Sequence, residues 1–249
     1  MLIGILQTGH ALPEVRDKTG DFDAMFERLL GGRDFTFRTW DVVDMDFPNS
    51  VEAADGWLIT GSKHGAYEDH PFIPPLEGFI RSAYAKRVPM VGVCFGHQII
   101  AQAMGGKVEK FHNGFGLGRQ TYTYGTEEIA LNAWHQDQVI TAPDMATTVI
   151  TNGFCQHAGL LYDDRIFTMQ PHPEFDATMI QGLIDIRGYG VGDEQRLAYA
   201  QSNIDKPTDS ARVAEDIGDF FLMARASADK AAAEAEAQAA KGTSSGAGA

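Results

Sequence analysis

The sequence contains little cysteine, no long apolar run and few basic residues, and each shortage excludes a class of protein. Only two of its 249 residues are cysteines, Cys94 and Cys155, which are too few for a disulfide framework or for a metal site built from thiolates. No run approaches the roughly 20 apolar residues that cross a bilayer, and Met1 to Leu6 carries no basic residue of the kind that opens a signal peptide. We therefore expect a cytoplasmic protein with reduced thiols.

The shortage of basic residues gives the chain a strongly negative charge. Twenty lysines and arginines oppose 34 aspartates and glutamates, so the formal net charge is −14. A field of this sign repels phosphate backbones and anionic lipid surfaces, which argues against nucleic acids and membranes as partners. The phosphate-binding pattern Gly-x-x-x-x-Gly-Lys-Ser/Thr is also missing, and we expect no cofactor.

The eight histidines show no spacing typical of metal ligands. His64 and His70 are six residues apart, and His10 and His112 stand alone, so we expect no metal site. Cys155 lies among short predicted strands with no recognisable motif around it, and we interpret it as a structural residue.

The first hundred residues alternate between short apolar runs and segments with helical spacing. This order, β-α-β-β-α-β-α, favours a parallel sheet with helices on both faces. The predicted strands are Leu2–Gln7, Phe35–Val42, Gly56–Thr60 and Pro89–Val93, and the predicted helices are Asp23–Leu30, Pro74–Lys86 and Phe95–Met104.

The next segment, from Lys107 to Gln170, reads as a series of short strands, and helices return after it. The predicted strands are 108–111, 119–124, 147–151, 159–162 and 166–169, and the predicted helices are 175–187, 194–203 and 210–226. No linker interrupts residues 1–224, and we take them as one domain.

Residues 225–249 have a different composition and are expected to form a partly disordered, alanine-rich tail. Ala228–Ala240 has high helix propensity but no apolar stripe to bury, and Lys241–Ala249 consists mainly of glycine, serine and alanine.

Segment 91–98, Val-Gly-Val-Cys-Phe-Gly-His-Gln, places a cysteine between two glycines where an apolar strand gives way to a helix. Serine hydrolases hold their nucleophile in such a strand-to-helix elbow, where flanking glycines tolerate a strained backbone. The following helix favours a thiolate at Cys94, and it aims the Phe95 backbone N–H at a developing oxyanion. Taken alone, the pentapeptide fits a buried structural cysteine equally well.

Segment 169–175, Met-Gln-Pro-His-Pro-Glu-Phe, offers a base for that cysteine. A cysteine nucleophile needs a group that holds it as a thiolate and then protonates the leaving amine, and His172 can do both. Glu174 can fix the tautomer of this imidazole. An isolated His-x-Glu is more often a simple turn before a helix. The prediction of a catalytic pair therefore depends on finding both segments in one chain.

The combination resembles the class I (triad-type) glutamine amidotransferase family, whose hallmark is a Gly-x-Cys-x-Gly elbow with a later His-Pro-Glu. The similarity runs from about Leu2 to Asp185. It implies a flavodoxin-like α/β fold, a three-layer sandwich with a mostly parallel central sheet. It also implies hydrolysis of a γ-glutamyl amide through a γ-glutamyl thioester on Cys94, with His172 as base and acid and Glu174 orienting it.

The same resemblance implies roles for residues around the elbow. It assigns the oxyanion hole to the backbone N–H groups of Gly61 and Phe95, and substrate binding to Ser62, Gln98 and His135. It places His135 and Gly114–Gly118 on loops beside the substrate. His97, next to the elbow, is expected to be structural rather than the base.

The residues of the elbow, with Gly-Gly-Lys-Val after its helix, are most similar to those of the stand-alone, GMP-synthase-like members, which include the γ-glutamyl peptidases. We therefore rank a free-standing hydrolase of glutamine or γ-glutamyl amines and peptides above a glutaminase subunit that delivers ammonia to a synthase partner. A non-catalytic binding or regulatory protein on this fold would show a broken triad. A related chaperone-or-protease family has a cysteine elbow but lacks the His-Pro-Glu. The sequence does not indicate the leaving amine or the oligomeric state.

Overall fold

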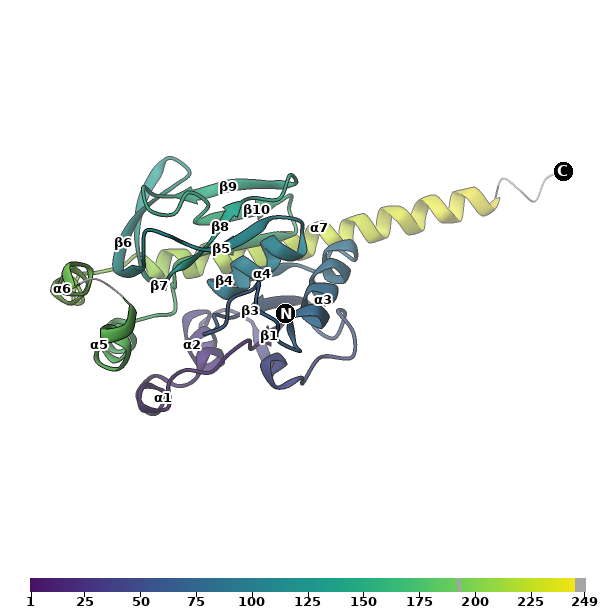
Figure 1. The fold of residues 1–249 in the computed structure, drawn as a ribbon. Coiled ribbons are helices and arrows are strands. Elements are labelled where there is room, and N and C mark those ends of the chain that lie inside the picture. Colours follow the sequence, from purple (N-terminus) through teal and green to yellow (C-terminus); the bar gives the residue numbers. More distant parts are fainter. Residues whose placement is uncertain (192–193, 245–249) are drawn as a thin grey trace.

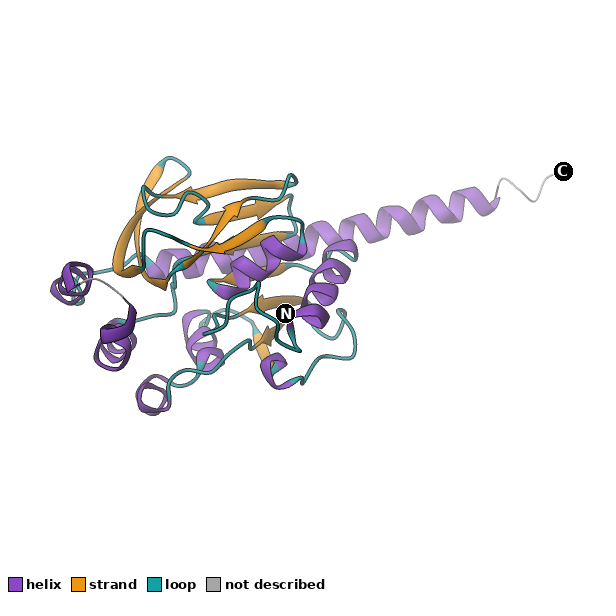
Figure 2. Cartoon of the chain, viewed as in Figure 1, coloured by secondary structure: helices purple, strands orange, loops and turns teal. Residues whose placement is uncertain are grey.

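A nine-stranded sheet forms the centre of the computed structural model, which describes residues 1–191 and 194–244 (Figures 1 and 2). The strand order is β2-β1-β3-β4-β11-β10-β9-β6-β7, and β5 and β8 form a separate two-stranded sheet. The strands are β1 (Leu2–Leu6), β2 (Thr36–Trp40), β3 (Gly56–Ile59), β4 (Met90–Val93), β5 (Lys107–Lys110), β6 (Gly116–Tyr124), β7 (Glu127–His135), β8 (Asp137–Thr141), β9 (Ala146–Thr151), β10 (Gly159–Tyr162) and β11 (Ile166–Met169).

The sheet has a parallel half and an antiparallel half. Strands β2, β1, β3, β4 and β11 run parallel to one another, whereas β10, β9, β6 and β7 pair antiparallel. Strands β3, β4 and β11 are buried along their whole length, as expected for a parallel sheet covered on both faces.

Helices cover both faces of the parallel half, which makes the fold a three-layer sandwich. Because successive strand residues point to opposite faces, Trp57 and Ile59 of β3 pack on one side with α3 and α4, while Leu58 packs on the other with α2 and α7. The helices are α1 (Pro13–Thr19), α2 (Phe22–Leu29), α3 (Ile73–Ala85), α4 (Phe95–Ala103), α5 (Ala177–Val191), α6 (Glu194–Ser202) and α7 (Ser210–Ser244), with a 3₁₀ turn η1 (Val42–Asp44). The fold class predicted from the sequence is confirmed.

The structure contains elements that the sequence did not reveal. Helix α1 and strands β7 and β8 were not predicted, and β7 and β8 are discussed with the site because β7 ends at His135 and β8 follows it. None of the helices in the described residues combines the length and apolar character that a membrane span requires.

Helix α7 runs past the expected end of the domain at residue 224 and leaves the body of the molecule (Figure 1). Arg225 donates to Asp55 at 3.2 Å, and Ser227 bonds Asp164, so the helix is still anchored just beyond the boundary. The first four residues of the segment 241–249, expected to be disordered, belong to this helix, and the remaining five lie outside the described residues. The division at residue 224 stays a prediction.

Candidate active site

Cys94 lies between β4 and α4 in a backbone conformation that few residues adopt. Its φ is +54° and its ψ is −105°, which an L-residue occupies only under constraint from its surroundings. A Cβ at Gly96 would lie 2.2 Å from the Ile59 carbonyl oxygen, and one at Gly92 would lie 2.6 Å from Gly96. Only glycine fits at these two positions. The Gly96 N–H also donates to Thr60 at 3.1 Å, which ties the turn to the end of β3.

The parallel pairing of β4 and β11 brings His172 to Cys94. Val93 lies opposite Met169, and the Cys94 N–H donates to the Met169 carbonyl at 2.8 Å. Because parallel neighbours end at the same edge of a sheet, the residues that follow both strands share one space. Cys94 and His172 line a cavity of about 70 Å³ there.

The loop that carries His172 is held from several sides. His172 Nδ1 lies 2.7 Å from Glu174 Oε1, and its ring stacks on Phe175 with centroids 3.8 Å apart. Asn132 of β7 accepts the His172 N–H at 2.8 Å, and its side-chain amide donates to the Phe175 carbonyl at 2.8 Å. The imidazole is therefore fixed in position, with Nδ1 engaged by the carboxylate and Nε2 left to face Cys94.

Electrostatics favour the protonated form of His172. Burial, the largest influence, lowers its pKa, but the charge of Glu174 and the charge and hydrogen bond of Cys94 outweigh it, and the pKa rises to about 10. An imidazolium beside Cys94 can stabilise a thiolate and can later donate a proton.

This raised pKa predicts a pH dependence of folding stability. The unfolded imidazole titrates near 6.5 and the folded one near 10, so its stabilising effect is complete below pH 6.5 and is lost as the pH rises through about 10. Glu174→Gln removes one cause of the raised pKa. We expect the wild-type chain to exceed this variant in urea midpoint at about pH 6, and the difference to shrink at about pH 10. An equal difference at both pH values would contradict the pairing.

Gly61 and Phe95, expected to supply oxyanion donors, both border Cys94. A Cβ at Gly61 would lie 3.1 Å from His172 Cε1 and 3.8 Å from Cys94 Cβ. Thr8 Oγ1 donates to the Gly61 carbonyl at 3.0 Å, which orients this turn. Phe95 is the first residue of α4, and the N–H groups of a first helical turn have no acceptor within the helix.

The residues expected to bind substrate, Ser62, Gln98 and His135, line a second cavity of about 270 Å³ together with Cys94. Ser62 Oγ donates to the Thr8 carbonyl at 2.7 Å, and the Gln98 amide donates to the Asp137 carbonyl and to Gln170, both at 2.9 Å. These bonds fix Ser62 and Gln98 in the cavity wall. Charged residues line the same cavity: Lys63, Glu68, Lys110, Asp137 and Arg187.

His135 reaches the cavity from a strand end rather than from a loop. It is the last residue of β7, and Asp137 begins β8, so the expected loop is a sharp turn between two strands at Gln136. Its Nδ1 lies 3.1 Å from the Asp137 carbonyl. Burial lowers the pKa of His135 to about 4, so it is a neutral polar group at pH 7.

His97 and Cys155 are both in the core. His97 Nδ1 bonds Thr168 Oγ1 of β11 at 2.8 Å, and burial lowers the pKa of this imidazole to about 3. Burial, with a contribution from the charge of Cys94, raises the pKa of the Cys155 thiol to about 12. These surroundings agree with the structural roles expected of both residues.

Three residues of the site escaped the sequence analysis. Asn132 positions the His172 loop, Phe175 stacks on the imidazole, and Arg187 of α5 lines both cavities beside Cys94. Asn132 carried a signal, because it interrupts the apolar run 129–134, and a buried polar residue in a strand needs a partner.

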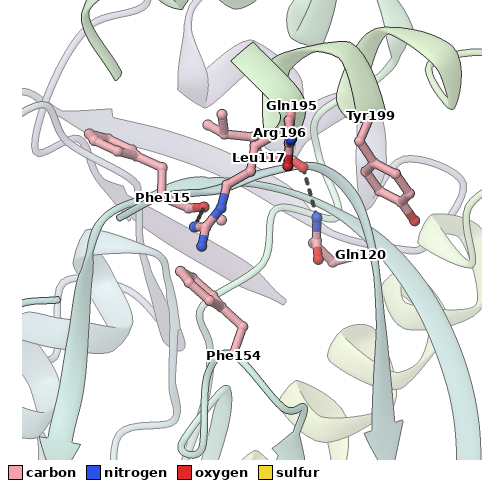
Figure 3. A pocket seen from close by; sticks show the side chains of 8 residues that line it. Phe115, Leu117, Gln120, Phe154, Gln195, Arg196 and Tyr199 are labelled. Carbon is pink, nitrogen blue, oxygen red and sulfur yellow. Dashed lines mark hydrogen bonds between the residues drawn. The ribbon is translucent and has the colours of Figure 1, made fainter. Parts of the chain in front are cut away.

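A larger cavity of about 480 Å³ adjoins the site and shares Phe115 with the cavity of Cys94 (Figure 3). Phe115 belongs to segment 114–118, which the family resemblance led us to expect beside the substrate. Arg196 of α6 donates to the Phe115 carbonyl at 2.6 Å, and its guanidinium lies 5.0 Å from the Phe154 ring centroid. Tyr199 closes another side of this cavity, which is thus both aromatic and polar.

The loop between β3 and α3 gathers His64, Glu68 and His70, whose ligand atoms lie within 4.8 Å of one another. Among residues 1–191 and 194–244 it is the one group of three such side chains close enough to hold a metal ion. The expectation of no metal site rested on the spacing of His64 and His70 along the chain, and it stays a prediction, although this loop brings the two imidazoles together.

Comparisons with known proteins agree with the geometry. Residues 34–183 match the family model described as glutamine amidotransferase class-I. A glutamine amidotransferase-like protein of Schizosaccharomyces pombe is 27% identical over 88% of this chain and 98% of its own. Gamma-glutamyl peptidase 4 of Arabidopsis thaliana is 30% identical over 67% of this chain and 72% of its own. A glutamine-hydrolyzing GMP synthase subunit of Halobacterium salinarum is 30% identical over 64% of this chain and 87% of its own.

Solved structures share the fold. The glutamine amido transferase from Methylobacillus flagellatus superimposes with a TM-score of 0.68 over 92% of this chain and 94% of its own, at 20% identity. A glutamine amidotransferase from Thermotoga maritima gives a TM-score of 0.67 over 90% and 96%, also at 20% identity.

Proposed function

The chain belongs to the class I glutamine amidotransferase family, and from this we propose that it hydrolyses γ-glutamyl amide bonds with Cys94 as the nucleophile. The observation that carries the proposal is the arrangement of Cys94, at φ +54° in its elbow, beside an imidazole that Glu174 holds at 2.7 Å. The family contains hydrolytic amidotransferases and γ-glutamyl peptidases, which supports an enzyme.

In the first step the Cys94 thiolate attacks the γ-carbonyl carbon of the substrate. His172 gives its Nε2 proton to the leaving nitrogen, the C–N bond breaks, and a γ-glutamyl thioester remains on Sγ. In the second step His172 accepts a proton from water, whose oxygen attacks the thioester carbon. The C–S bond then breaks, glutamate leaves, and the thiolate and imidazolium are restored.

The negative oxygen that forms in both steps needs donors that are already in place. We assign this role to the backbone N–H groups of Phe95 and Gly61, which border Cys94 from the start of α4 and the end of β3. Ser62, Gln98 and neutral His135 are assigned to binding the glutamyl part, because they line the cavity of Cys94 and their own hydrogen bonds hold them there.

The leaving group is proposed to be larger than ammonia. Two observations support this: the 480 Å³ cavity that shares Phe115 with the cavity of Cys94, and the similarity to γ-glutamyl peptidases over about two thirds of the chain. Phe154 and Tyr199 offer apolar and stacking surface for such a group, and Gln120 offers hydrogen bonds.

A second candidate function is that of a glutaminase subunit that passes ammonia to a synthase partner. The similarity to a GMP synthase subunit favours it. A non-catalytic role on the same fold is less well supported, because Cys94, His172 and Glu174 are all present and adjacent.

A panel of glutamine and γ-glutamyl peptides, assayed for glutamate release with the purified chain alone, tests the proposal. We expect turnover of peptides in preference to glutamine. Tyr199→Ala should raise KM for the peptides about three- to tenfold, by loss of an aromatic contact, and leave the hydrolysis of glutamine unchanged.

Tyr189→Ala is the matched control, because Tyr189 is fully exposed on α5 and is not among the residues that line the three cavities described above. Negligible turnover of every substrate until a synthase is added would favour the ammonia-delivering role. An equal rise in KM for glutamine and for peptides in Tyr199→Ala would show that the leaving group does not bind in this cavity.

A further inference from the structure

The loop of residues 60–72, between β3 and α3, carries a second group of chemically active side chains beside the Cys94 cavity. Glu68 Oε2 lies 2.8 Å from His70 Nε2 and 3.7 Å from His64 Nδ1. The two imidazole rings are tilted by 56° relative to each other, with centroids 3.9 Å apart. None of these three side chains takes part in the proposed mechanism.

Two imidazoles and one carboxylate are a ligand set for zinc and neighbouring divalent metals. Zinc holds nitrogen and oxygen ligands at about 2.0–2.2 Å, so the ligand atoms around a tetrahedral ion are roughly 3.3–3.5 Å apart. The separations of 2.8 and 3.7 Å from Glu68 to the two imidazoles bracket this value, and all three ligand atoms lie within 4.8 Å of one another. An ion could therefore enter with small side-chain shifts, replacing the hydrogen bond between Glu68 and His70.

The loop holds these side chains in place before any ion binds. Ser62 Oγ accepts the His64 N–H at 3.2 Å, and the Glu68 N–H donates to the Gly65 carbonyl at 3.0 Å. Both imidazoles pack on Phe72, with centroid separations of 5.9 Å. Phe72 is 2% exposed, so the cluster rests on a rigid base. Preorganised ligands lose little conformational freedom when a metal binds.

We propose that His64, Glu68 and His70 form a binding site for one divalent transition-metal ion of the zinc class at the wall of the Cys94 cavity. The charge of Glu68 offsets that of the neighbouring Lys63. Three protein ligands leave the fourth position of a tetrahedral ion open to water or to a donor atom of a bound molecule. This assignment stands on the loop alone and does not depend on the proposed hydrolysis.

The position of the site has a consequence for the enzyme. His64 and Glu68 line the same cavity of about 270 Å³ as Cys94, whereas His70 does not line it. An ion held there narrows the space that a γ-glutamyl substrate must enter. Occupancy of the site should therefore inhibit the proposed hydrolysis, and this consequence, unlike the binding itself, rests on the proposed function.

The binding test uses calorimetric titration of zinc chloride into chelator-treated protein that carries Cys94→Ser, since the Cys94 thiol and His172 could themselves bind zinc. We expect one ion per chain. Adding His70→Ala should weaken binding at least about tenfold, and adding Glu68→Gln should weaken it comparably. His112→Ala, which removes another exposed imidazole, should leave it unchanged.

Cobalt(II) absorption gives a second readout, because a tetrahedral site made of nitrogen and oxygen lacks the thiolate charge-transfer band. Unchanged stoichiometry and affinity in the Cys94→Ser/His70→Ala chain would overturn the metal site. For inhibition, the His70→Ala chain with intact Cys94 should keep basal hydrolysis and resist zinc. Full zinc inhibition in that chain would assign the effect to Cys94 and refute the proposed consequence.

Discussion

Replacing Cys94 with serine is expected to lower glutamate release by at least about a thousandfold. A neutral hydroxyl is a far weaker nucleophile than a thiolate, and the His172–Glu174 pair is arranged to hold a thiolate. The loss should appear in kcat, because the substitution leaves the cavity and its hydrogen bonds nearly unchanged. Steady-state assays on the best γ-glutamyl substrate of the panel measure it.

Cys155→Ala is the matched control for this experiment. Cys155 is fully buried, and burial raises the pKa of its thiol to about 12, so it should remain an unreactive thiol. An electrophilic glutamine analogue should therefore label Cys94 alone, as peptide mass mapping can verify. Label on Cys155, or labelling that survives Cys94→Ser, would refute the assignment of the nucleophile.

Replacing His172 with alanine is expected to cost roughly a thousandfold or more in rate. The substitution removes the cation that stabilises the thiolate, the acid for the leaving amine and the base for water in one change. It also removes the ring that stacks on Phe175, so the fold of the variant should be checked by circular dichroism. Near-normal activity in a folded His172→Ala chain would show that another residue is the base.

The partners of His172 give a graded comparison. Glu174→Gln keeps the imidazole but removes the carboxylate at 2.7 Å, so we expect a smaller loss than for His172→Ala and an altered pH profile. His97→Gln is the matching imidazole control, because His97 bonds Thr168 in the core. A larger rate loss in His97→Gln than in His172→Ala would indicate that His97, and not His172, is the base.

The elbow was predictable because its requirements are local. Glycine is the one residue that fits at positions 92 and 96, where a Cβ would collide with Gly96 and with the Ile59 carbonyl. Because this constraint acts between residues close together in the chain, it appears in the sequence as the Gly-x-Cys-x-Gly pattern. The parallel half of the sheet was predictable for a similar reason, since strands β1, β3 and β4 are continuous apolar runs.

Strand β7 was not predictable on the same grounds. Its residues Ile129 to Ala133 are buried without the alternation of a half-exposed strand, although only Gly125 and Thr126 separate it from its antiparallel partner β6. The partner of Asn132 could not be read from the sequence, because it bridges to His172, which follows a distant strand. Helix α7 differs again, because residues 225–238 are rich in alanine, glutamate and lysine, which propagate the helix with no buried stripe. No glycine or proline between Gly218 and Gly242 marks a stopping point near residue 224.

By itself, the sequence determined the cysteine elbow, the His-Pro-Glu turn, the family to which both belong and the layered α/β fold. These depend on neighbouring residues and on periodicity, which a linear pattern records. Only the tertiary structure decided that β4 and β11 end side by side, that Asn132 and Phe175 hold His172, and that His64, Glu68 and His70 meet. The physical reason is that these contacts arise from strand pairing and from the path of an irregular loop. The spacing of the residues along the chain therefore does not predict them. The elbow made Cys94 a candidate, and the neighbouring strand end supplied its base.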